Sequence, residues 1–292
     1  MGFALAFMSA LFFSIANILL KKGMKHSEHN GVWIITFINV LVLGVILLMS
    51  LFLLEIPFDL DPLGLIIFIL SGIFINVLGR GLLYRGIRQI GSSKAVAIKN
   101  SAPVITFIFA IIVINEQITM WPFIGIILIF IGLFFLGIQF FQEESQQVQR
   151  VGYMISLLSA LGYGLGQGMS KQAMEYVPNP FLGVFVGTLA ALVILTFVEG
   201  SKGKIRKHLY SAKENPLYIW TGIITSLALL FFYLSVSFIP VSYAVAILAV
   251  DPVLTVILVT FFMKKEEVIS KLIVFVATIV FIGAVIISLT GA

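Results

Sequence analysis

Residues 84–106 read YRGIRQIGSSKAVAIKNSAPVIT, and residues 233–255 read YLSVSFIPVSYAVAILAVDPVLT. The two stretches align without a gap at an offset of 149 residues, and 10 of the 23 aligned positions are identical. The shared residues include the tyrosine that opens each stretch and a proline near its end, which a similar apolar composition alone does not explain. We interpret the pair as the trace of a tandem duplication that spans the whole chain.

The composition places this duplication in a membrane. Of the 292 residues, 60% are hydrophobic and 11% are charged, which leaves too little polar surface for a soluble domain. A helix needs about 20 apolar residues to cross the hydrocarbon layer, and the sequence predicts ten such spans. They are residues 2–20, 32–54, 63–88, 92–114, 119–140, 151–173, 179–198, 216–238, 242–263 and 269–290. We therefore expect an all-α integral membrane protein with ten transmembrane helices.

The duplication divides these spans into two units of five. We expect a first repeat at residues 1–141, a linker at residues 142–150 and a second repeat at residues 151–292. Because five is odd, the second unit enters the membrane upside down relative to the first. Inverted repeats are the usual framework of transporters that work by alternating access, with the substrate site at the repeat interface near the bilayer midplane.

The basic residues predict an orientation in the membrane. Fifteen of the 18 lysines and arginines lie in, or at the edges of, the connections that follow the first, third, fifth, seventh and ninth spans. Positively charged loops stay in the cytoplasm, so this pattern places both termini outside. The first span has no basic residue before it and no small-residue cleavage pattern after it, so we interpret it as a retained helix and not as a cleaved signal.

Several classes of function lack the residues that they need. The chain has no cysteine, and His26, His29 and His208 all fall in connecting segments, so we expect no metal site and no cofactor. Its positive charges are scattered over loops, which argues against nucleic-acid binding. The sequence contains no ATP-binding phosphate loop. The acidic residues after the second span have no histidine or nucleophile nearby, so we do not expect an enzyme.

Three ionisable residues within the predicted spans are the main candidates for a binding site: Arg80, Lys99 and Asp251. A charge near the bilayer centre costs roughly 2.5–3.5 kcal/mol even on the mild insertion scale, so such residues normally face a cavity or a partner. Asp251 is the tenth residue of its span, which at 1.5 Å per residue puts it about 15 Å from the span's start. We expect it either to bind substrate or a coupling proton, or to bond neighbouring helices.

Lys99 and Arg80 leave two interpretations open. The Lys99 ammonium either snorkels towards water or faces a cavity, where it pairs with Asp251 or with a substrate carboxylate. The second interpretation is geometrically reasonable because the fourth and ninth spans are repeat mates. Arg80 either contacts a substrate or bonds a helix end or a lipid phosphate.

Neutral polar residues extend this candidate site. On the third span, Asn76, Arg80 and Tyr84 recur every four residues and so share one face of an α-helix, which we expect to point inward. The other candidates for substrate binding are Asn100, Tyr163, Gln167 and Tyr233, the last being the repeat mate of Tyr84. Any single neutral polar group in a membrane helix more often bonds another helix than a ligand.

Pro103 and Pro252 occupy the same position in the two repeats. Each removes a backbone donor from its helix and leaves the carbonyl one turn earlier without its usual partner. We therefore predict a helix kink at both positions, with a local opening beside Asp251 that a ligand or an ion could use. Ala102 stands at the equivalent of Asp251 in the first repeat, so the acid breaks the symmetry of the duplication.

Each repeat also carries a longer motif: a proline early in a span, an acidic residue after the span and a glycine in the next one. These residues are Pro103, Glu116 and Gly132 in the first copy, and Asp251, Pro252, Glu267 and Gly283 in the second. With this pattern the chain resembles EamA-domain proteins of the drug/metabolite transporter superfamily. The resemblance implies ten helices around a central cavity, with the fifth and tenth helices at the periphery. It also implies that both termini lie in the cytoplasm, whereas the charge pattern places them outside. We expect Glu116 and Glu267 to cap helix ends or to face headgroups.

We therefore predict a secondary transporter in the cell membrane that moves a small polar metabolite by rocking of its inverted halves. Arg80 and Lys99 favour an anionic or zwitterionic solute, and Asp251 suits an ammonium group or a coupling proton, so an amino acid satisfies all three. The alternative is proton-coupled efflux of cationic amphiphilic drugs, in which Asp251 dominates. The expected partners are the solute, the lipid bilayer and a coupling proton or counter-substrate; the oligomeric state stays open.

Overall fold

The computed structural model describes residues 1–25, 31–53, 60–90, 92–141, 149–206, 208, 215–262 and 271–291. Over these ranges the chain is helical apart from turns and short connections, and it contains no strand. The prediction of an all-α protein is thereby confirmed. Residues 142–148 of the predicted linker and Glu267 lie outside the described residues, and the repeat limits stay a prediction.

The helices follow the predicted spans. Those of the first repeat are α1 (Gly2–Lys25), α2 (Val32–Leu53), α3 (Pro62–Gly72), the π-helix η1 (Ile73–Arg80), α4 (Gly81–Ile90), α5 (Ser92–Lys99), α6 (Ala102–Ile112) and α7 (Met120–Phe141). Those of the second are α8 (Gln149–Tyr176), α9 (Pro180–Ser201), α11 (Leu217–Phe238), α12 (Val241–Leu248), α13 (Asp251–Phe262) and α14 (Lys271–Thr290). One predicted span comprises α3, η1 and α4, which run on without a break. Another comprises α5 and α6, and a third comprises α12 and α13. Counted in this way, the described helices form the ten predicted spans.

The fourth and ninth spans are each split into two half-helices. The breaks fall at residues 100–101 and 249–250, which are the same positions in the two repeats. Pro103 and Pro252 are each the second residue of the half-helix that follows. Proline has no N–H to donate and a fixed φ near the helical value, so it begins a helix more easily than it continues one. The predicted kinks are therefore complete breaks, located just before the prolines.

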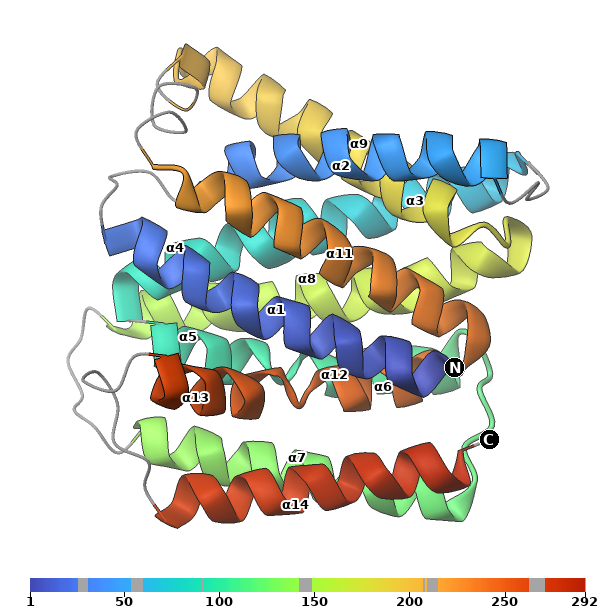
Figure 1. Ribbon diagram of the computed structural model, residues 1–292, viewed down its shortest axis with the longest axis vertical. Coiled ribbons are helices and arrows are strands. Elements are labelled where there is room, and N and C mark those ends of the chain that lie inside the picture. Colours follow the sequence, from blue (N-terminus) through green and yellow to red (C-terminus); the bar gives the residue numbers. More distant parts are fainter. Residues whose placement is uncertain are drawn as a thin grey trace.

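The two broken spans run in opposite directions. Figure 1 shows α5 and α13 at one end of the molecule and α6 and α12 at the other. Since α5 precedes α6 and α12 precedes α13, the first span crosses the molecule one way and the second crosses it the other way. α6 contacts α12 between the two repeats. This antiparallel arrangement confirms the inverted repeat.

Glycines bring several helices into backbone contact. A Cβ on Gly72 of α3 would collide with the backbone of Gly187 of α9. A Cβ on Gly125 of α7 would lie 2.7 Å from the carbonyl oxygen of Gly283 on α14, and a Cβ on Gly283 would lie 2.6 Å from that of Gly125. Small residues permit the close packing on which helix association in lipid depends. α7 and α14 form a pair at the edge of the molecule (Figure 1), where the fifth and tenth helices were expected.

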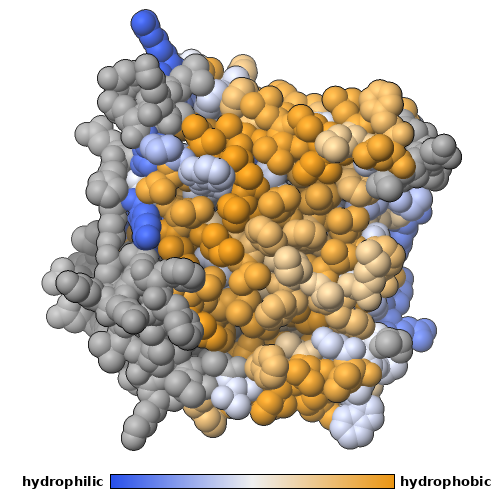
Figure 2. Space-filling model, viewed as in Figure 1, coloured by the Kyte–Doolittle hydropathy of each residue, from blue (hydrophilic) through white to orange (hydrophobic). Residues whose placement is uncertain are grey.

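A belt of apolar side chains covers the outside of the bundle. Figure 2 shows hydrophobic residues across the middle of one face and hydrophilic residues towards its two sides. Phe52, Phe197 and Phe134 are 85%, 77% and 66% exposed, and large apolar surfaces of this kind mark contact with a membrane or a partner. Among the described residues, five helical spans are long and apolar enough by themselves to cross a bilayer: α1, α2, α3 to α4, α9 and α11. These features indicate a multi-pass membrane protein.

The crossing of α3 and α9 yields a first prediction. Gly72→Ala should destabilise the protein by about 1–3 kcal/mol, because a methyl group forces the two backbones apart. Gly81→Ala is the matched control, since a Cβ there meets no atom within 4 Å. The measurement is thermal unfolding in detergent. Equal melting temperatures for the two variants would contradict the close contact.

The position of the termini yields a second prediction. Both termini lie at one end of the molecule, opposite the end where α1, α4 and α13 finish and the basic connections follow (Figure 1). The positive-inside rule then places residue 292 outside the cytoplasm. An alkaline phosphatase fused after residue 292 should be active and a green fluorescent protein fused there should be dark. The opposite pair of signals would show that the termini are cytoplasmic, as the family resemblance implies.

Candidate functional site

A small cavity lies between the two repeats. It has a volume of about 40 Å³, which is room for a few water molecules. Its lining residues come from eight helical segments: Phe13, Ala16 and Asn17 of α1, Arg80 of η1, Leu83 and Tyr84 of α4, Val96 and Lys99 of α5, Tyr163 and Gln167 of α8, Thr225 of α11, Leu248 of α12 and Asp251 of α13. The cavity therefore brings together six of the residues predicted for the site: Arg80, Lys99, Asp251, Tyr84, Tyr163 and Gln167.

Asp251 is the acidic centre of this cavity. The break in the ninth span makes it the first residue of α13, where the positive end of the helix dipole favours a carboxylate. Ser14 Oγ donates to Oδ1 at 2.9 Å, and Asn17 Nδ2 lies 3.2 Å from Oδ1 and 3.1 Å from Oδ2. Thr255, one turn further along α13, donates to Oδ1 at 3.2 Å. The carboxylate is thus held by α1 and by its own helix.

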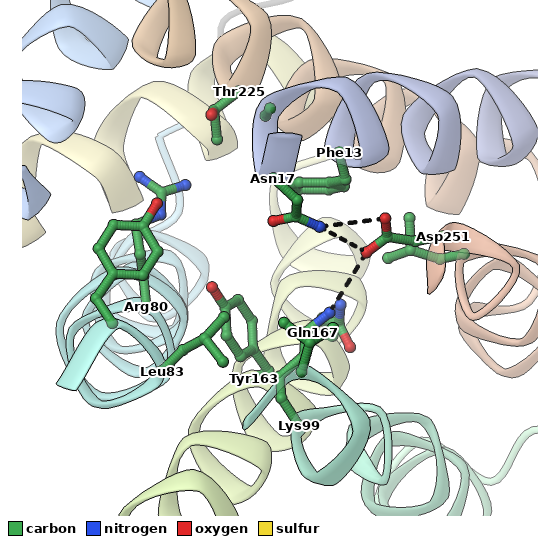
Figure 3. A pocket seen from close by; sticks show the side chains of 13 residues that line it. Phe13, Asn17, Arg80, Leu83, Lys99, Tyr163, Gln167, Thr225 and Asp251 are labelled. Atoms are coloured by element: carbon green, nitrogen blue, oxygen red, sulfur yellow. Dashed lines mark hydrogen bonds and ion pairs between the residues drawn. The ribbon is translucent and has the colours of Figure 1, made fainter. Parts of the chain in front are cut away.

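Lys99 approaches the same carboxylate from the opposite repeat. It is the last residue of α5, where the negative end of the helix dipole favours a cation. Its Nζ lies 3.9 Å from Asp251 Oδ2, 3.4 Å from Asn100 Oδ1 and 5.3 Å from the centre of the Tyr163 ring. Figure 3 shows Asn17, Lys99 and Asp251 converging from three helices. Of the two interpretations for Lys99, the structure favours the cation that faces the cavity and pairs with Asp251.

Arg80 is the second cation of the cavity and is 2% exposed. It closes the π-helix η1. The side-chain oxygen of Asn39 on α2 accepts a hydrogen bond from Arg80 Nη1 at 2.9 Å. In this orientation of the amide, the side-chain nitrogen of Asn39 donates to Ser226 and to nearby backbone carbonyls. The guanidinium also hydrogen-bonds the Tyr163 hydroxyl. These partners of Arg80 are neutral groups.

The charges of the lining do not balance. Among the described residues, those that line the cavity comprise two cations, Arg80 and Lys99, and one acid, Asp251. Lys99 is the cation within 4 Å of the acid, whereas the named partners of Arg80 carry no charge. Removing a charge from water is costly unless it is paired. The cavity is therefore suited to a negatively charged group beside Arg80.

Three residues predicted for the site are not among the residues that line the cavity. Tyr233 points to α3 and hydrogen-bonds Ser71 at 3.3 Å, and Asn100 sits in the break as the acceptor for Lys99. Asn76 donates to the Gly72 carbonyl at 3.1 Å. Both Asn76 and Arg80 lie in η1, but Arg80 lines the cavity and Asn76 does not.

The site predicted from the sequence left out several side chains that hydrogen-bond Asp251 or line the cavity. Asn17 is the one amide side chain in a span whose other polar side chains are serines, which was the available signal for it. Ser14, Thr225 and Thr255 have hydroxyl groups that are common in membrane helices, and nothing in the sequence separates them from other serines and threonines. Their importance comes from α1 and α11 packing against the second broken span, a contact between residues more than 200 positions apart for Ser14 and Asp251.

Glu116 and Lys171 hold the start of the second broken span. Glu116 accepts from the Val241 and Ser242 backbone N–H groups at 2.7 and 3.2 Å, and from Ser242 Oγ at 2.6 Å. It therefore caps the N-terminus of α12, as predicted. Lys171 donates to the carbonyl of Val236 at 2.6 Å, at the C-terminal end of α11. The two side chains thus fix the corner that leads from α11 into α12.

The sequence model of the EamA-like transporter family matches residues 1–138 and 150–289, so two copies of the domain cover nearly the whole chain. The chain belongs to the EamA-like transporter family. This places the protein among membrane transporters of the drug/metabolite type and fits the two-repeat architecture. A search of curated protein sequences finds no match.

A solved structure titled "Crystal structure of protein" has a similar fold. It superposes with a TM-score of 0.73 over 99% of this chain and 96% of its own, at 13% sequence identity. At that identity the likeness concerns the fold alone. The ten-span arrangement of this EamA protein therefore recurs in a chain of almost the same extent.

The pairing of Lys99 with Asp251 yields a third prediction. Lys99→Met should destabilise the protein by about 1–3 kcal/mol, because it leaves a buried carboxylate without its cation. The double variant Lys99→Met/Asp251→Asn should recover most of that loss, since it removes both charges together. Thermal unfolding in detergent measures both effects. A double variant less stable than Lys99→Met would show that the two charges do not interact.

Proposed function

We propose that this EamA protein is a secondary transporter of the cell membrane for a small solute that bears a carboxylate, such as an amino acid or a related anion. The observation that carries this proposal is the buried Arg80 guanidinium, which faces the cavity among neutral groups while Lys99 lies beside Asp251. Guanidinium groups bind carboxylates in a bidentate geometry. Arg80 therefore supplies the anchor that the solute's carboxylate would meet.

The remaining side chains fit the rest of an amino acid. Asp251 and Lys99 are 3.9 Å apart, longer than the usual distance of a charge-assisted hydrogen bond. A solute ammonium group can therefore compete with Lys99 for the carboxylate, as can a proton. Tyr84, Tyr163 and Gln167 offer hydroxyl and amide groups to the polar part of the solute. Asp251 would then alternate between Lys99 and either the solute or a coupling proton.

The volume of the cavity supports alternating access. A space of about 40 Å³ holds a few waters, so a solute of amino-acid size enters only when the two halves move apart. The breaks at residues 100–101 and 249–250 provide points at which the half-helices can change their angle, and they occur in both repeats. Rocking about these breaks would open the cavity first to one side of the membrane and then to the other.

Proton-coupled efflux of cationic amphiphiles is the alternative. Such a solute would need Asp251 for its positive charge, but the carboxylate already has Lys99, Ser14, Asn17 and Thr255 around it. Arg80 adds a second positive charge to the same lining. Both cations would repel a cationic solute, so the geometry favours the carboxylate-bearing one.

Uptake into proteoliposomes tests the proposal and is our fourth prediction. The wild type should accumulate at least one compound from a panel of radiolabelled amino acids and small carboxylic acids. Arg80→Gln should lower that uptake about tenfold or more, because the charge-assisted bonds to the carboxylate are lost. Arg80→Lys should retain part of the activity, since the charge remains.

Arg150→Ala is the matched control, because Arg150 is exposed and lies outside the cavity. Its uptake should equal that of the wild type. The proposal would be overturned if Arg80→Gln took up the same panel compound as fast as the wild type. Transport of ethidium that survives Arg80→Gln but is lost in Asp251→Asn would instead support the efflux of cationic amphiphiles.

A further inference from the structure

A second cavity lies on the lateral side of the molecule. It has a volume of about 210 Å³, and it is bounded by α2, the η1–α4 segment, α9 and His208. None of its lining residues belongs to the central cavity. It lies where α2 begins and α9 ends, which is the end of the molecule at which α1 and α4 finish (Figure 1). This cavity is larger than the proposed transport site and has no part in the proposed function.

Its charged groups leave one cation available. Glu199 is already matched, because its carboxylate lies 3.1 Å from His208 Nε2 and 3.5 Å from Lys202 Nζ. Arg85 is exposed and lines the cavity, and it has no hydrogen-bond or ion-pair partner within the described parts of the chain. A lone guanidinium at the rim of a cavity is suited to an anion with several acceptor oxygens, above all a phosphate.

The walls of the cavity are apolar and reach the outer surface of the bundle. Leu78 of η1 lines it and is 38% exposed. Trp33 forms another wall: its indole N–H donates to Thr196 Oγ1 at 2.9 Å, and its ring stacks on Phe37 with the ring centres 5.4 Å apart. A fixed tryptophan near a helix start is typical of the membrane–water interface. The cavity thus joins a cationic rim to a hydrophobic wall that continues into the lipid-facing belt.

We propose that this cavity binds the headgroup of a membrane phospholipid. Arg85 would contact the phosphodiester, and the acyl chain would lie along Leu78 and the apolar belt. Basic pockets between membrane helices bind lipid headgroups through this combination of charge and apolar surface. A soluble phosphate compound would use the cation but not the hydrophobic wall.

The site has a direct structural link to the transport cavity. The π-helix η1 presents Leu78 to the lateral cavity and Arg80 to the central one. A π-helix is rare and is frequently found at functional sites. A bound lipid therefore lies against the segment that positions the proposed carboxylate anchor.

Native mass spectrometry of the detergent-purified protein with added phosphatidylglycerol tests the site and is our fifth prediction. Arg85→Ala should lower the amount of retained lipid about fivefold, the effect of removing one cation near a lipid phosphate. Gly81→Leu should lower it as well, because Gly81 lines the cavity and a Cβ there meets no atom within 4 Å. The larger side chain would fill the cavity without disturbing the helix, which thermal unfolding verifies.

The controls distinguish binding at this cavity from non-specific attraction of anionic lipid to the protein's basic residues. Arg150→Ala removes an exposed cation elsewhere, and Gly81→Ala leaves most of the cavity open; both should retain lipid as the wild type does. Diacylglycerol, which lacks the phosphate, should not be retained. Equal lipid retention by wild type and Gly81→Leu, or equal loss in Arg85→Ala and Arg150→Ala, would overturn the proposal. The proposal would also be overturned if glycerol 3-phosphate stabilised the protein against heat only when Arg85 is present, while lipid retention did not depend on Arg85.

Discussion

A bilayer offers no hydrogen-bonding partner to an interrupted backbone or to an unpaired charge, and the centre of this protein is organised by that constraint. Two helices break at residues 100–101 and 249–250, and both breaks lie inside the bundle. The break in one repeat ends α5 at Lys99, and the break in the other begins α13 at Asp251. Each charge therefore stands at the helix end whose dipole favours it, and each is the other's partner across the repeat interface.

The duplication explains why both repeats contain a broken span, and residues that differ between the two copies explain the charges at the breaks. Lys99 has Leu248 as its repeat mate, and Asp251 has Ala102. The same break therefore carries a cation in one copy and an acid in the other. Had both copies kept the same charge at the same position, two like charges would have met near the middle of the membrane. The loss of symmetry at these positions turns a structural repeat into a polar site with a net positive charge.

The π-helix η1 gives the second cation its place. Two side chains stabilise this segment: Ser159 of the neighbouring α8 donates to the Gly79 carbonyl at 2.6 Å, and Asn76 of η1 itself donates to the Gly72 carbonyl at 3.1 Å. With these bonds made, Arg80 is turned towards Asn39 and Tyr163 and away from lipid. The altered winding also leaves Leu78 on the lateral side. One short segment thus serves both the central cavity and the phospholipid site that we propose.

The sequence alone determined the number of spans, the inverted duplication, the family resemblance and the three candidate charges within the spans. Hydropathy, gapless self-similarity and the cost of a charge in lipid are all properties of the linear chain. It also indicated the cap at Glu116. Only the tertiary structure decided that the prolines mark breaks, that Asn76 and Tyr233 lie outside the cavity lining, and that Ser14 and Asn17 hold Asp251. The physical reason is that these membrane helices are apolar on nearly every side, so periodicity does not show which face points inward. That choice depends on contacts between residues as far apart in the chain as α1 and α13.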